Sequence, residues 1–118
     1  MLQLTPHMRL LVCVEPIDFR NGIDGLVRVC RDALAEDPFH GTVFVFRNRR
    51  RTSVKLLAYD GQGFWLCQKR LSNGRFGWWP EGAATRTLAA HELQVLLSAG
   101  DPRGARAPAD WRPIGAAK

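Results

Sequence analysis

Three apolar runs separated by short polar segments constrain the fold of this chain more than any other feature. The runs occupy residues 42–46, 54–59 and 64–71 and are rich in β-branched and aromatic residues, as β-strands are. Residues 60–63, Asp-Gly-Gln-Gly, are a strong tight-turn signal, and residues 47–51 separate the first two runs. The sequence therefore predicts consecutive antiparallel strands joined by hairpins.

Two further segments extend this predicted sheet. Residues 72–74, Ser-Asn-Gly, predict another turn, after which residues 75–79 predict a last strand before Pro80. The short apolar run at residues 9–14 predicts an N-terminal strand. A sheet of four antiparallel strands is therefore expected, with the N-terminal strand as a possible fifth.

Helices are predicted on either side of the meander in the sequence. Asp18 is a suitable N-cap, and apolar residues recur at helical spacing after it for roughly 16 residues. Asp37 ends this amphipathic helix, because the residue before a proline disfavours helical geometry. Thr87 predicts the cap of a second helix that runs to about Ser98.

The expected fold class is α+β: an antiparallel β-meander of four to five strands packed against an N-terminal amphipathic helix and a C-terminal helix. Strand alternation suggests helices on one side of the sheet and an amphipathic surface on the other. Lys55, Tyr59, Trp65 and Lys69 are candidates for that surface, although which residues gather there depends on strand register.

The length of the chain, 118 residues with 46% hydrophobic residues, predicts one modest core. Residues 1–100 are therefore expected to form a single α+β domain. From residue 101 to 118 the composition shifts to Pro, Gly, Ala and Arg, which predicts a flexible tail. No stretch approaches the ~20 apolar residues of a membrane span, and no signal pattern opens the chain, so we expect a cytoplasmic protein with no membrane partner.

Positive charge is concentrated in the middle of the sequence. The chain carries 17 Lys+Arg and 11 Asp+Glu, a formal net charge of +6. Residues 1–41 contribute −2, residues 42–86 contribute +7 and residues 87–118 contribute +1. A basic face of this kind attracts nucleic acid or an anionic membrane.

Four arginines crowd the predicted hairpin loop at residues 47–51, Arg-Asn-Arg-Arg-Arg. Guanidinium groups so close together repel one another unless an anion lies between them, and phosphate is the anion that they bind in a bidentate fork. A solvated loop with counterions is the simpler alternative. The candidate nucleic-acid-binding residues are Arg47, Arg49, Arg50, Arg51, Lys55, Lys69, Arg70 and Arg75.

Tryptophans supply the other candidate surface. Trp65, Trp78 and Trp79 fall in predicted strands, where aromatic residues serve the core or an interface more often than they stack on bases. Tryptophan and arginine also dominate protein-binding hot spots. These three residues are therefore candidates for a partner interface, with base stacking as the alternative.

Catalytic and metal chemistry have little support in the sequence. Asp18, Asp24 and Asp60 have simpler roles as a cap, a solvated helix residue and a turn residue, and no nucleotide-binding or nucleophile motif is present. The three cysteines lie in separate apolar runs, as buried reduced thiols do, and the three histidines lack ligand spacing. We expect no enzyme activity, no metal, no cofactor and no small-molecule substrate.

Several ordered motifs resemble one known family. Residues 18–26 resemble a D-x-R-x-G-x-D-G-L signature, and further matches follow at residues 37–41, 45–49, 55–57, 59–64, 69–71 and 74–78. Together they are similar to the small accessory protein, TnpB, of bacterial insertion sequences of family sixty-six. The motif positions are occupied by Arg20, Gly22, Asp24, Gly25, Arg47, Arg49, Lys55, Asp60, Gly61, Lys69 and Arg70.

The resemblance implies a role in transposition beside the transposase, without strand-transfer activity of its own. Two functions are then open. The chain binds DNA through its basic hairpin and sheet surface, or it docks on the transposase or another element-encoded protein without contacting DNA. A protein that bridges DNA and transposase would need both surfaces.

Overall fold

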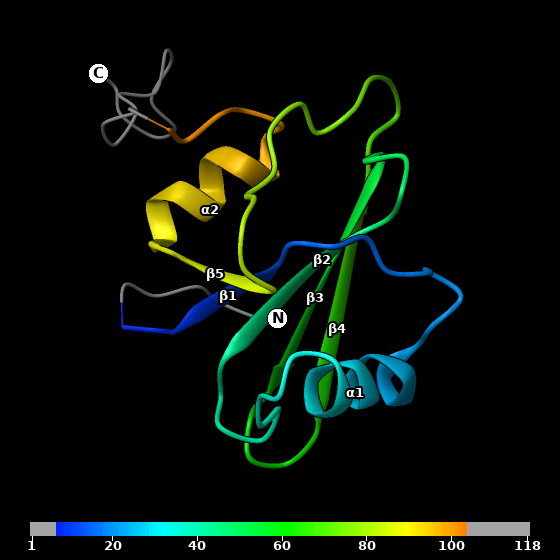
Figure 1. The fold of residues 1–118 in the computed structure, drawn as a ribbon, viewed down its shortest axis with the longest axis vertical. Coiled ribbons are helices and arrows are strands. Elements are labelled where there is room, and N and C mark those ends of the chain that lie inside the picture. The colour runs from blue at the N-terminus through cyan, green and yellow to red at the C-terminus, as the bar shows by residue number, and fades with distance from the viewer. Residues whose placement is uncertain (1–6, 104–118) are drawn as a thin grey trace, which may run out of the picture.

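The computed structural model describes residues 7–103, and Figure 1 shows their arrangement. Five strands form one sheet in the order β4-β3-β2-β1-β5, and two helices pack against it. The α+β class expected from the sequence is confirmed. The expected tail at residues 101–118 lies, from residue 104 onward, outside the described residues.

The central meander forms as its alternating apolar runs and turn signals predict. Its strands are β2 (Val43–Arg47), β3 (Ser53–Tyr59) and β4 (Phe64–Arg70), and each pairs antiparallel with the next. Asp60 closes the second turn, since its Oδ1 atom accepts the backbone N–H groups of Gln62 and Gly63 at 2.9 Å each.

The other side of the sheet differs from the prediction. β1 (Leu10–Cys13) runs parallel to β2, so the sheet is mixed and not a fully antiparallel meander. Residues 75–79 were predicted as the last strand but form no strand, and β5 (Thr85–Leu88) takes the edge position beside β1. Phe76 and Trp79 are instead buried in a core on one face of the sheet, which explains the strand-like apolar composition of that segment.

The two helices cover opposite faces of the sheet, not one face as expected. Helix α1 (Ile23–Asp32) places Leu26 and Cys30 in a core with Phe44 and Leu57. Helix α2 (Ala90–Leu97) belongs to the core on the other face. That second core contains Val12, Val45, Leu56, Phe76, Trp79, Leu93 and Leu96. Both faces are thus largely covered, and functional side chains must lie at the ends and edges of the sheet.

Both predicted helix starts were too early. Helix α1 begins after Gly22, because the Asp18 carboxylate accepts the N–H of Arg20 in a separate turn that precedes the helix. Thr87 belongs to β5, where it pairs with Leu11. Helix α2 begins after Ala89, whose N–H donates to the Glu92 carboxylate at 2.8 Å.

The three cysteines are free, and two are buried in the core under α1. Burial raises the pKa of Cys13 to about 11 and that of Cys30 to about 12. Thiols with such high pKa values are poor nucleophiles at neutral pH. Cys67 is partly buried on the opposite face of the sheet.

Candidate nucleic-acid interface

The loop between β2 and β3 is cross-linked by hydrogen bonds of its own polar groups. Asn48 Oδ1 accepts the N–H groups of Thr52 and Ser53 at 2.9 and 3.1 Å, and Asn48 Nδ2 donates to Thr52 Oγ1 at 2.8 Å. Arg51 has a positive φ of 59°, a strained conformation for a residue with a side chain. Its backbone is fixed on both sides, since its N–H donates to Asn48 O and its carbonyl accepts the N–H of Phe76. The loop therefore presents its arginines from a preorganised backbone.

The three arginines at the tip of this loop lie between two hollows. Arg49 and Arg50 are exposed and line a hollow of about 370 Å³ together with residues 16–19. Arg51 is half-buried and lines a larger groove of about 530 Å³ on the side of α2. Among residues 7–103, none of the three forms an ion pair with a carboxylate. Their charge is therefore available to an external anion.

Arg47 supports the loop from within. Its Nη1 atom donates to the carbonyls of Asn48 and Arg49 at 3.3 and 3.5 Å, and its guanidinium lies 5.9 Å from the Trp79 ring centroid. Burial and the nearby Arg51 charge lower its pKa below the usual arginine value. Its Nε atom is buried without a partner among the described residues. Arg47 therefore supports the loop from inside and does not extend from it.

Lys55 also has a structural role. It is only 6% exposed, and its ammonium group donates to the carbonyls of Phe19 and Asn21 at 2.9 and 2.8 Å. Desolvation lowers its pKa from the usual lysine value. The ammonium also lies 4.8 Å from the Phe19 ring centroid. Lys55 thus holds the segment before α1 against the sheet, and we leave it out of the proposed interface.

The strand register separates the four residues that were candidates for one amphipathic surface. Lys55 pairs with Gln68 and Tyr59 with Phe64, so these residues lie on the face that α1 covers. Trp65 and Lys69 pair with Ala58 and Val54, on the other face. The candidate cluster of Lys55, Tyr59, Trp65 and Lys69 does not form.

We predict that Lys55→Met lowers stability without changing affinity for DNA. The substitution keeps most of the apolar stem but leaves two inward-facing carbonyls without their donor, which costs roughly 1–3 kcal/mol. Urea unfolding followed by circular dichroism measures the first effect, and fluorescence anisotropy with labelled duplex measures the second. A large loss of affinity in a folded Lys55→Met protein would instead return Lys55 to the interface.

Further basic residues lie at the same end of the sheet as the loop. Lys69 and Arg70 end β4, which is antiparallel to β3 and therefore ends beside the β2–β3 loop. Lys69 is exposed, and its Nζ atom donates to Leu97 O at 2.6 Å, at the C-terminus of α2. Arg70 and Arg75 are exposed. We call the following set the basic end of the molecule: Arg49, Arg50, Arg51, Lys69, Arg70 and Arg75.

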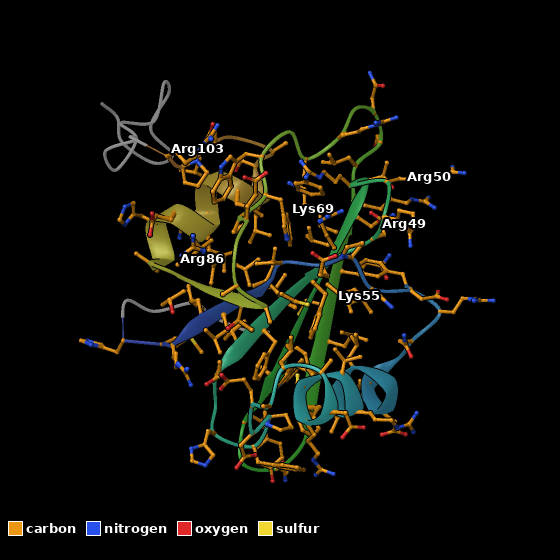
Figure 2. All side chains as sticks on the ribbon, viewed as in Figure 1. Arg49, Arg50, Lys55, Lys69, Arg86 and Arg103 are labelled. Carbon is orange, nitrogen blue, oxygen red and sulfur yellow. The ribbon has the colours of Figure 1, made fainter. Side chains whose placement is uncertain are left out.

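Two arginines that sequence reasoning did not select, Arg86 and Arg103, line the groove beside Arg51. Figure 2 shows Arg49, Arg50, Lys69 and Arg103 in its upper half, where the β2–β3 loop also lies. Arg86 lies in β5, a strand that was not predicted. The β-branched residues Thr85 and Thr87 on either side of Arg86 are a weak strand signal. Arg103 had been assigned to the tail.

The three candidate interface tryptophans do not form one patch. Trp79 is 3% exposed, and its indole N–H donates to Cys13 O at 2.9 Å, so it is a core residue. Trp78 is half-buried in the groove, with Arg103 over its ring at 5.9 Å. Trp65 is 42% exposed beside the β3–β4 turn, at the opposite end of β4 from Arg70, and its indole N–H donates to Asp60.

The motif at residues 18–26 has a structural explanation. Asp18 pairs with Arg20, which lowers the pKa of the carboxyl group to about 2. Asn21 donates from Nδ2 to Asp18 O, and its side chain occupies the space that a Cβ atom on Gly25 would need. The motif thus builds the turn that Lys55 holds. Because Arg20 neutralises the charge of Asp18, this carboxylate reduces the positive potential of the nearby Arg49 and Arg50 less than an unpaired carboxylate would.

The described residues offer no obvious metal centre or membrane segment. Between residues 7 and 103, no group of three or more His, Cys, Asp or Glu side chains lies close enough to hold a metal ion. In the same range, neither helix is long and apolar enough to cross a bilayer.

Comparison with known proteins gives one family. A family model described as "IS66 Orf2 like protein" matches residues 8–107. The chain is 34% identical over 91 residues to the uncharacterized protein y4jC of Sinorhizobium fredii, covering 77% of this chain and 78% of that one. It is 33% identical over 113 residues to the uncharacterized protein y4hO of the same organism, covering 96% of each. No solved structure gives a significant match.

Proposed function

Since this chain belongs to the IS66 Orf2-like family of insertion-sequence proteins, we propose that it is a non-catalytic accessory factor of transposition that binds duplex DNA through its basic end. The arginines of the loop would contact phosphates, with Lys69, Arg70 and Arg75 beside them. Such contacts position a protein on DNA but carry no base information directly.

One observation carries this proposal. Arg49, Arg50 and Arg51 project from a loop whose backbone is hydrogen-bonded to Asn48, and none pairs with a carboxylate among the described residues. Protein surfaces usually disperse or neutralise like charges, whereas phosphate-binding surfaces keep guanidinium groups unpaired until the ligand arrives. The exposed side chains of Arg49 and Arg50 are long enough to adapt to the phosphate spacing.

A salt titration of binding tests the proposal. The purified protein is mixed with a fluorescein-labelled duplex, and anisotropy is recorded at increasing salt from ~50 mM, where phosphate contacts are strongest. Roughly four to six phosphate contacts give a slope of log K against log salt of about −4 to −5. Absence of binding at the lowest salt, or affinity independent of salt, would overturn the proposal.

A second candidate function is docking on the transposase, and the exposure of Trp65 favours it. Trp65 is 42% exposed on β4, an edge strand whose outer side has no partner strand among the described residues. Exposed tryptophans and free strand edges are common docking features. This surface is distant from the basic end along β4, so docking and DNA binding are compatible.

Co-purification of the tagged protein with the transposase of its element separates the two candidates. Docking through Trp65 predicts a complex that survives high salt and is lost in Trp65→Ser, whereas docking through the basic end predicts a complex that high salt dissociates. No complex under either condition would leave DNA as the partner.

A further inference from the structure

A groove of about 530 Å³ lies between the β2–β3 loop and β5. Its volume lies within the roughly 300–1,000 Å³ range of small-ligand sites, and it is too small for a DNA duplex. The groove is lined by Arg51, by Glu92 and by the segments 77–81, 86–88 and 102–103, so that Arg86, Arg103 and Trp78 share it with Arg51.

Arg86 is oriented toward this groove by the loop before β5. Its Nε atom donates to Glu81 O at 2.7 Å. A Cβ atom on Gly82 would lie 3.1 Å from Arg86 Nη2, and Gly82 has a φ of 107°, so this close approach depends on glycine. The two Nη groups have no protein acceptor among the described residues. Arg86, although exposed, therefore presents two donor groups at the groove, as a phosphate site requires.

Trp78 supplies an aromatic surface beside these charges. It is half-buried in the groove, and the Arg103 guanidinium lies 5.9 Å from its ring centroid. Arg103 is itself held by Asp101 through Nε and Nη2. Indole rings and guanidinium planes are the two surfaces on which unpaired bases stack.

The groove also contains acceptors, which a site for phosphate alone would avoid. Glu81 and Glu92 both line it. Glu92 is engaged at the start of α2, but the Glu81 carboxylate forms no ion pair within residues 7–103. A carboxylate accepts the exocyclic amino group of a base. Guanidinium groups, an aromatic ring and a carboxylate acceptor together match a whole nucleotide.

We infer that this groove binds an unpaired nucleotide of DNA next to a duplex held at the basic end. The inference rests on the proposed function, because Arg51 belongs to both surfaces and connects them. The phosphate lies against Arg51 and Arg86, and the base lies against Trp78. The protein would then prefer a duplex with a single-stranded extension to a blunt duplex.

The test compares the affinity of the protein for one duplex in two forms, blunt and with a short single-stranded extension on either strand. Stacking and phosphate contact for one nucleotide predict about tenfold tighter binding of one extended form in the native protein. Arg86→Gln should lower this ratio, because it removes one of the two guanidinium groups at the phosphate. Arg28→Gln, an equal charge change at an exposed position of α1, should keep it.

Tryptophan fluorescence gives a second readout. Addition of the extended duplex should quench emission more than the blunt duplex does, and the difference should vanish in Trp78→Phe. Equal affinity of the native protein for blunt and extended duplexes, or an unchanged ratio in Arg86→Gln, would overturn the inference. Failure of the proposed function looks different, since neither form of the duplex would then bind at ~50 mM salt.

Discussion

Replacing Arg49 and Arg50 together by alanine is expected to weaken duplex binding about 100-fold near 0.1 M salt. Each phosphate contact contributes about 0.9 to the slope of log K against log salt, which is roughly a tenfold effect per contact at that concentration. The slope should therefore become shallower by about 2. Anisotropy titrations of native and variant proteins at several salt concentrations measure both quantities.

The matched control is Arg28→Ala with Arg31→Ala, which removes the same charge from α1. Both arginines are exposed, and α1 lies at the other end of the sheet from the β2–β3 loop (Figure 1). If affinity depended only on net charge, the control would lose as much as the loop variant. Equal losses would remove the loop from the interface, whereas a loss confined to Arg49 and Arg50 would locate it there.

Trp79→Ala is expected to lower the free energy of unfolding by about 3–5 kcal/mol, the largest stability effect that we predict. Trp79 is 3% exposed in the core under α2, and its indole N–H donates to Cys13 O. The substitution opens a cavity and leaves a buried carbonyl unpaired. Since small domains are stable by only about 5–15 kcal/mol, much of the native stability would be lost.

Two further variants show whether burial is the cause. Trp65→Ala removes the same side chain at a 42% exposed position and should cost well under half as much. Trp79→Phe keeps an aromatic ring but removes the hydrogen bond to Cys13 O, and should lie between the native protein and Trp79→Ala. Urea unfolding of all four proteins gives the order, and similar values for Trp65→Ala and Trp79→Ala would contradict it.

Local signals made half of the fold predictable. The β2–β3–β4 meander was predicted because each hairpin joins neighbours in sequence, and turn residues mark where the chain reverses. The tip arginines were found for the same reason. A loop between two apolar strands must lie outside the core, whatever the rest of the sheet does.

Contacts between distant segments were not predictable in this way. The local sequence around Arg47 and Lys55 predicted surface charges, because it does not show which distant segment packs against them. Lys55, for example, is covered by α1 and by the loop before that helix. The segment at residues 75–79 has strand-like composition, but its large side chains fill a core under α2. Arg86 was missed because β5 is short and forms a strand only by pairing with β1, which is distant in the sequence.

The position of β1 in the sheet has a consequence for synthesis on the ribosome. Leu10 is made early, but its partner Leu88 emerges 78 residues later, and α2 follows. Until then, the nascent chain exposes the apolar face that α2 covers in the finished protein. The groove is lined by the same late segments, so it forms only when this face closes. A prematurely terminated chain that ends before β5 would therefore lack both the closed core and the groove in which we propose that the nucleotide binds.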